Sequence, residues 1–176
     1  PIVYAAALEM GFSPNDLVKD EQFTIKLPGS DSWTPKNYSN VFSGEVTLTR
    51  AFSESLNIPA IKISEAIGRA SVSELGKKFG LFSDPNKGPA IALGTSEATL
   101  LDLVGAYATI LNQGTKIEPF GWEKLQLKKN KNEILMGKSE RAAIEIVDPE
   151  TAQNLIFMMS EVTKNGTGKR AQFSDW

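Results

Sequence analysis

Two serine–asparagine pairs in this chain have a spacing that suits acyl-transfer chemistry. Ser55 and Asn57 flank a single residue, and Ser13 and Asn15 repeat that arrangement. A serine hydroxyl can relay a proton, and an asparagine amide carries both a donor and an acceptor that can hold a peptide bond of a substrate. Because the triplet occurs twice in one chain, its spacing alone favours ordinary turn and helix-capping roles for both pairs.

The residue types that are absent narrow the chemistry further. The 176 residues include no cysteine and no histidine, which excludes thiol catalysis, histidine-based triads and the usual zinc sites. A serine mechanism would therefore need a lysine amine as its base.

The basic residues do not indicate nucleic acid or nucleotide binding. The formal net charge is -2, and the one basic run, at 128–131, is too short for a nucleic-acid footprint and predicts a solvated turn. A phosphate-binding loop at 166–169 is excluded, because Thr163 stands where a glycine is required and Arg170 where a serine or threonine is required.

The acidic residues do not indicate a metal site. Asp16, Asp20 and Glu21 form the tightest acidic cluster, but their spacing does not match a calcium loop. We interpret them as a solvated charged face, and we expect no metal ion and no other cofactor.

The elements that must position Ser55 and Asn57 are predicted to be mostly helices. The apolar run 1–10 predicts a buried helix, and residues 20–46 are predicted to be irregular, with one short strand at 22–27. Further helices are predicted at 47–56, 59–68, 71–79, 96–112 and 149–164, and the helix at 96–112 has a broad apolar face. A hairpin is predicted at 122–136. Since Ser55 ends one helix and Asn57 lies at the bend before the next, both side chains can face one cleft.

Several short blocks extend this pattern along the whole chain. They are 1–9, 33–38, 46–48, 55–60, 92–97, 100–103, 105–108 and 165–168. In sequence and in order they resemble the transpeptidase domain of class A penicillin-binding proteins, the bifunctional peptidoglycan synthases. The resemblance covers residues 1 to about 170 and is specific as a set rather than block by block.

The resemblance implies that residues 1–176 are a partial transpeptidase domain. The chain is mainly α and would be the helical lobe of an α/β fold that serine β-lactamases share, with the central sheet mostly outside. The family's active site uses Ser-x-x-Lys, Ser-x-Asn and Lys-Thr-Gly motifs, and only the second is found here. The family places the first motif immediately before Pro1 and the third shortly after Trp176.

The resemblance also implies a function. Its members are D,D-transpeptidases that cross-link peptidoglycan stem peptides through a serine acyl-enzyme and are acylated by β-lactams. The family's Ser-x-Asn motif maps onto Ser55, for proton relay, and Asn57, for contact with the substrate amide. Four residues are further candidates for substrate binding, by their place in the family's cleft-side loop or near the cleft mouth: Trp33, Asn37, Thr167 and Gly168.

The implied partners are stem peptides, β-lactam antibiotics and the remainder of the same domain, on the extracytoplasmic side of a membrane that anchors the parent protein. A glycosyltransferase domain would lie upstream. The segment alone is expected to be inactive, because it has no nucleophile and no base. A serine β-lactamase-like hydrolase and a non-catalytic helical interaction domain are the alternatives, and the blocks at 33–38 and 94–102 favour the synthase over the lactamase.

Overall fold

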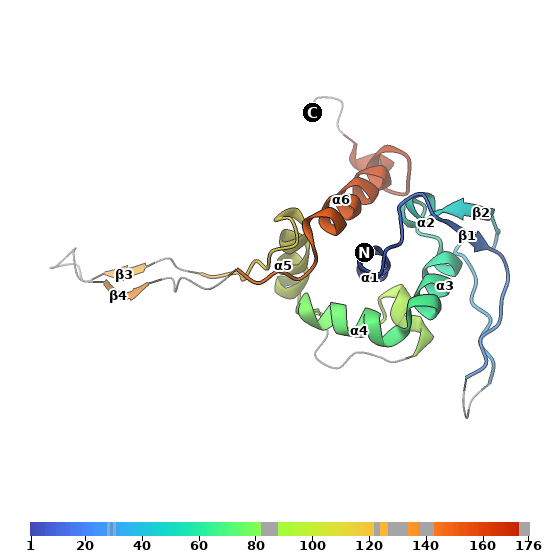
Figure 1. Ribbon diagram of the computed structural model, residues 1–176, viewed down its shortest axis with the longest axis horizontal. Coiled ribbons are helices and arrows are strands. Elements are labelled where there is room, and N and C mark those ends of the chain that lie inside the picture. The colour runs from blue at the N-terminus through green and yellow to red at the C-terminus, as the bar shows by residue number, and fades with distance from the viewer. Residues whose placement is uncertain are drawn as a thin grey trace.

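The computed structural model describes residues 1–27, 29, 31–81, 88–121, 124–126, 134–137 and 143–172. Within these ranges the chain is mainly helical, and α1 (Ile2–Glu9) lies near the centre of the helical body (Figure 1). The other helices are α2 (Leu48–Ser53), α3 (Asn57–Ile67), α4 (Arg69–Lys78), α5 (Leu100–Leu111) and α6 (Pro149–Lys164), with 3-10 turns at Pro89–Leu93 and Lys169–Ala171. These bounds confirm the predicted helices to within a few residues.

Helix α1 is central because it is apolar on every side. All residues from Val3 to Leu8 are buried, and α1 contacts α3, α4 and α6. Its three consecutive alanines, Ala5 to Ala7, allow these neighbours to approach closely, since the distance between packed helices depends on the side chains at the contact. The apolar run at the start of the chain therefore forms the buried helix that the sequence predicted.

The described strands form two separate antiparallel pairs. Strand β1 (Leu17–Asp20) pairs with β2 (Gly44–Thr47), so that Asp20 lies opposite Gly44. The expectation of an irregular segment at 20–46 missed this pair, and the strand expected at 22–27 is reduced to one bridge between Ile25 and Trp33. Strand β1 carries Lys19 and Asp20 and has no apolar alternation to signal it.

The second pair confirms the predicted hairpin. Strands β3 (Lys124–Gln126) and β4 (Ile134–Gly137) are antiparallel and project away from the helical body (Figure 1). No central sheet is built from the described residues, in agreement with a helical lobe.

Helix α5 exposes its apolar face. Leu100 is 78% exposed and Leu101 is 61% exposed, while Ala106 and Ile110 on the other side are buried. The broad apolar stripe that the sequence predicted for this helix is thus present but uncovered by the described residues. Among the described helices, none has both the length and the hydropathy that crossing a membrane requires.

Candidate functional site

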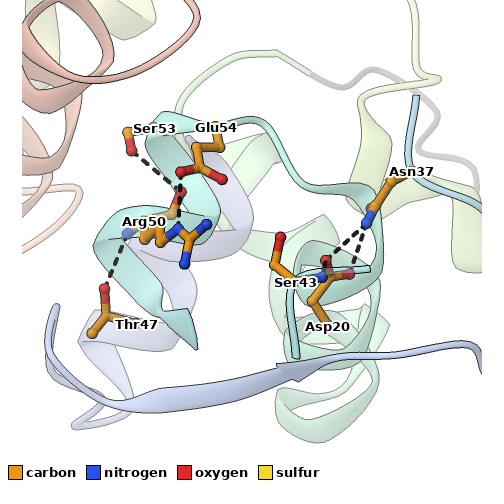
Figure 2. Close-up of polar contacts among 7 residues, drawn as sticks. All are labelled: Asp20, Asn37, Ser43, Thr47, Arg50, Ser53 and Glu54. Atoms are coloured by element: carbon orange, nitrogen blue, oxygen red, sulfur yellow. Dashed lines mark hydrogen bonds and ion pairs between the residues drawn. The ribbon is translucent and has the colours of Figure 1, made fainter. Parts of the chain in front are cut away.

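The bend between α2 and α3 carries Ser55 and Asn57. Helix α2 begins after its cap, Thr47, whose hydroxyl accepts a hydrogen bond from the Arg50 N–H at 3.2 Å (Figure 2), and it ends at Ser53. Ser55 then adopts a left-handed backbone conformation with a φ of 53°, which costs a non-glycine residue about 1–3 kcal/mol. The chain turns there and enters α3 at Asn57.

Ser55 and Asn57 line the same cavity, whose volume is about 490 Å³. Pro1 and Ile2, at the N-terminal end of α1, form another part of its wall. Ser55 is exposed, and among the described residues its hydroxyl has no hydrogen-bond partner. The structure thus brings both side chains to one cavity beside the start of α1, while their chemical roles stay predictions.

The side chain of Asn57 is anchored on one side only. Its Nδ2 donates a hydrogen bond to the carbonyl oxygen of Lys36 at 2.9 Å. An asparagine amide has two N–H donors and one carbonyl oxygen, so one donor and the acceptor remain for a ligand. This is the hydrogen-bonding capacity that holding a substrate peptide group requires.

Asn37 lies behind this bend and not in the cavity wall. It is only 4% exposed, and its Oδ1 accepts hydrogen bonds from the backbone N–H groups of Asn57 at 3.0 Å and Ile58 at 3.2 Å. Its Nδ2 donates to Asp20 and to the Val41 carbonyl oxygen at 2.9 Å. Asn37 therefore occupies a buried capping position at the start of α3, and its contact with a substrate stays a prediction.

Asp20 corrects the expectation of a solvated acidic face. It is fully buried, and its carboxylate accepts hydrogen bonds from Asn37 Nδ2, at 2.8 and 2.9 Å, and from the Ser43 N–H at 2.7 Å (Figure 2). A buried charge is tolerated when hydrogen bonds replace its hydration. The other two acidic residues point elsewhere: Asp16 accepts from the Ser13 N–H, and Glu21 pairs with Lys62 at 3.1 Å.

The remaining substrate-binding candidates do not line the cavity. Trp33 is half-buried and pairs through its backbone with Ile25. The Thr167 N–H donates to the Ser53 carbonyl oxygen at 3.0 Å, and the Gly168 N–H donates to the Val162 carbonyl oxygen at 2.9 Å. The 166–168 turn therefore packs against the end of α2, which precedes Ser55 closely in sequence.

The second serine–asparagine triplet behaves as a turn. The Ser13 N–H donates to Asp16 Oδ2 at 2.8 Å, and the Asn15 N–H donates to Ser13 Oγ at 3.3 Å. Both residues line a different cavity, of about 650 Å³. The local hydrogen bonds expected for this triplet are confirmed.

Two buried hydroxyl groups in the cavity wall were missed by the sequence analysis. Tyr4 packs edge-on against Phe52, with ring centroids 5.0 Å apart, and burial raises the pKa of its phenol well above the ordinary value. Among the described residues, the hydroxyls of Tyr4 and Ser96 have no hydrogen-bond partner, and both residues line the 490 Å³ cavity. A tyrosine within an otherwise aliphatic helix was the only signal in the sequence.

Comparisons with known proteins agree with this architecture. The penicillin binding protein transpeptidase domain matches residues 1–176. The chain is 40% identical over 118 residues to penicillin-binding protein 1A of Rickettsia typhi, which covers 66% of this chain and 15% of that protein. It superposes on the structure of penicillin-binding protein 1A from Haemophilus influenzae with a TM-score of 0.87 at 26% identity, covering 97% of this chain and 31% of that one.

A third relative supports the fold alone. The imipenem acyl-enzyme complex of penicillin-binding protein A from M. tuberculosis gives a TM-score of 0.78 at 22% identity, covering 98% of this chain and 44% of that one. The chain therefore spans less than half the length of each of these relatives. Its mainly helical structure matches one part of their fold, and the match over all 176 residues shows that the chain belongs to the penicillin-binding protein transpeptidase domain family.

Proposed function

We propose that this chain supplies the Ser-x-Asn part of a D,D-transpeptidase that cross-links peptidoglycan stem peptides. The observation that carries the proposal is the strained bend that brings Ser55 and Asn57 to one cavity beside the start of α1. On this proposal the chain is a partial domain, interior to the Ser-x-x-Lys and Lys-Thr-Gly motifs. By itself it is inactive, because it holds neither a Ser-x-x-Lys nor a Lys-Thr-Gly motif.

In the complete domain, the serine of the Ser-x-x-Lys motif attacks the carbonyl carbon of the penultimate D-alanine, and its lysine takes the proton. The bond to the terminal D-alanine breaks, and the amine that leaves takes up a proton through the Ser55 hydroxyl. An amine of a neighbouring strand then attacks the ester, forms the cross-link and releases the serine. Asn57 holds the substrate amide in both steps with its remaining donor and its acceptor.

The same serine would be acylated by β-lactams, just as penicillin-binding protein A of M. tuberculosis forms an acyl-enzyme complex with imipenem. Because peptidoglycan is assembled outside the cytoplasm, the complete protein would work on the extracytoplasmic side, anchored in the membrane. A serine β-lactamase would use the same attack but hydrolyse the acyl-enzyme quickly. The lifetime of a fluorescent penicillin adduct on the full-length protein separates the two.

The proposal is tested by substitution in the full-length protein. Ser55→Ala should slow acylation by fluorescent penicillin about 10²-fold, the lower end of the range for a lost proton-transfer group. Asn57→Ala should slow it by a similar factor of about 10², because the substrate amide loses the group that positions it. The chain offers a matched control, because Ser13→Ala and Asn15→Ala remove the same two side chains from the turn on the other cavity. Acylation at the wild-type rate in both Ser55→Ala and Asn57→Ala would overturn the assignment of this triplet.

A further inference from the structure

The start of α3 is capped from a distant part of the chain. Leu56 occupies the capping position of this helix and makes no side-chain hydrogen bond, although the first N–H groups of a helix need acceptors. The acceptor is Asn37 Oδ1, which lies twenty positions before Asn57 and receives the N–H groups of Asn57 and Ile58. The location of Asn57 is therefore set by the loop that contains Asn37.

Asp20 determines which way the Asn37 amide faces. A carboxylate only accepts hydrogen bonds, so the NH₂ group of Asn37 must point to Asp20 and its carbonyl oxygen must point to α3. Asp20 is itself fixed, because it is fully buried, lies opposite Gly44 in the β1–β2 ladder and accepts the Ser43 N–H. The negative charge also lies near the N-terminal end of α3, where the helix dipole favours it.

The bend is held on both of its sides. Ser55 keeps a φ of 53°, and a strained residue persists only where the surrounding structure fixes it. On the α2 side the Thr167 N–H holds the Ser53 carbonyl oxygen, and on the α3 side Asn37 holds the backbone of Asn57 while the Lys36 carbonyl oxygen holds its side chain.

We infer that Asn37, oriented by the buried carboxylate of Asp20, is a positioning residue for the Ser55–Asn57 site. This inference rests on the proposed function, since it assigns a purpose to the bend that carries Ser55 and Asn57. Without the Asn37 acceptor the first turn of α3 loses its cap, and the strained bend can relax. A displacement of about 1 Å in a catalytic group can lower a rate about 10²-fold.

The test exchanges the amide and the carboxylate in the full-length protein. Asn37→Asp places two carboxylates against each other and should lower the acylation rate by fluorescent penicillin about 10²-fold. In the double variant Asn37→Asp/Asp20→Asn, the amide at position 20 donates to the carboxylate at position 37, which still accepts the α3 N–H groups. The hydrogen bond to the Val41 carbonyl oxygen and one of the two contacts between positions 37 and 20 are lost, so the rate should recover to within about tenfold of the wild type.

The rate is measured on the folded fraction, with thermal unfolding recorded in parallel, because a merely structural role would lower stability and leave that rate unchanged. A folded Asn37→Asp variant with the wild-type rate would overturn the inference, as would a double variant that folds but does not recover. If Asn37→Asp does not fold, Asp20→Asn carries the test: it weakens a charge-assisted hydrogen bond and should slow acylation about threefold to tenfold, and an unchanged rate overturns the inference.

Two further variants separate this inference from the proposed function. Glu21→Gln changes the charge next to Asp20 but touches only the exposed pair with Lys62, and it should keep the wild-type rate. If Ser55→Ala and Asn57→Ala slow acylation while the positions of Asn37 and Asp20 tolerate substitution, the positioning role alone fails. If Ser55→Ala and Asn57→Ala have no effect, the proposed function itself fails.

Discussion

Ser55 keeps a side chain at a backbone position that glycine would occupy at lower cost. Its φ of 53° lies in the left-handed region, where an L side chain approaches the following carbonyl group. Its hydroxyl is nevertheless exposed, lines the cavity and has no partner among the described residues. The hydroxyl therefore makes no hydrogen bond within the described residues, and it is free for the proton relay that we propose.

Replacing Ser55 by glycine separates strain from chemistry. We expect Ser55→Gly to remain within about 1 kcal/mol of the wild-type free energy of unfolding, because relief of strain offsets the larger entropy loss of glycine. Ser55→Ala keeps the strain and should be about 1 kcal/mol less stable than the glycine variant. Acylation should be slowed by the same factor in both variants, because both lack the hydroxyl. Thermal unfolding checks the order, and a glycine variant less stable than the alanine variant would contradict it.

The residues of the site differ in how far sequence alone could place them. The bend that carries Ser55 and Asn57 could be predicted because the motif and both helix ends are local in the chain, and the roles of the two residues stay predictions. The burial of Asn37 could not be predicted, because its partners, Asp20 and the start of α3, are each about twenty residues away. A pattern within one segment cannot reveal an acceptor that another segment brings in, and the same separation concealed the burial of Asp20.

At the scale of helices and turns, the turn at 166–168 fixes the position of the end of α2. Gly166 packs directly against the backbone of Ser53, and a Cβ atom on Gly166 would lie 2.1 Å from the Ser53 carbonyl oxygen. The neighbouring Thr167 N–H donates to that same oxygen at 3.0 Å. The turn that follows α6 thus supports the α2 end of the bend, although neither Thr167 nor Gly168 lines the cavity.

We expect Gly166→Ala to show this support. Its Cβ meets backbone rather than a flexible side chain, so the turn or the end of α2 must shift, at a cost of about 1–3 kcal/mol in the free energy of unfolding. The shift should also slow acylation, since Ser55 follows Ser53 closely. Gly121→Ala is the matched control, because its Cβ would have nothing within 4 Å. Denaturant unfolding measures the difference, and equal stability of the two variants would refute tight packing at this turn.

Helical periodicity in the sequence predicted whole elements, whereas the pairing between distant strands could not be predicted. The helices and the hairpin near 122–136 follow from the spacing of apolar residues and from turn residues within single segments. Strands β1 and β2 have four residues each and lie more than twenty positions apart. Neither carries an alternating apolar pattern, so only the folded chain shows that they pair and bury Asp20.

At the scale of the whole molecule, the exposure of the apolar face of α5 needs an explanation. Monomeric proteins seldom leave a large contiguous apolar patch exposed, yet Leu100, Leu101, Val104 and Leu111 are all more than half exposed here. The relatives are much longer than this chain, which spans 31% of the Haemophilus influenzae structure. We propose that the remainder of the transpeptidase domain covers this face.

This proposal predicts that one double substitution affects stability strongly in the full-length protein and little in the 176-residue chain alone. In the full-length protein, Leu101→Glu/Val104→Glu should lower the free energy of unfolding by about 3 kcal/mol or more, because two charges would be buried without partners. In the 176-residue chain alone the same positions face solvent, so its stability should change by less than about 0.5 kcal/mol and its tendency to aggregate should fall. Leu17→Glu is the control, since Leu17 is exposed on β1 and should be tolerated in both settings. Unfolding curves and light scattering supply the measurements, and a small effect of the double substitution in the full-length protein would show that α5 faces solvent there as well.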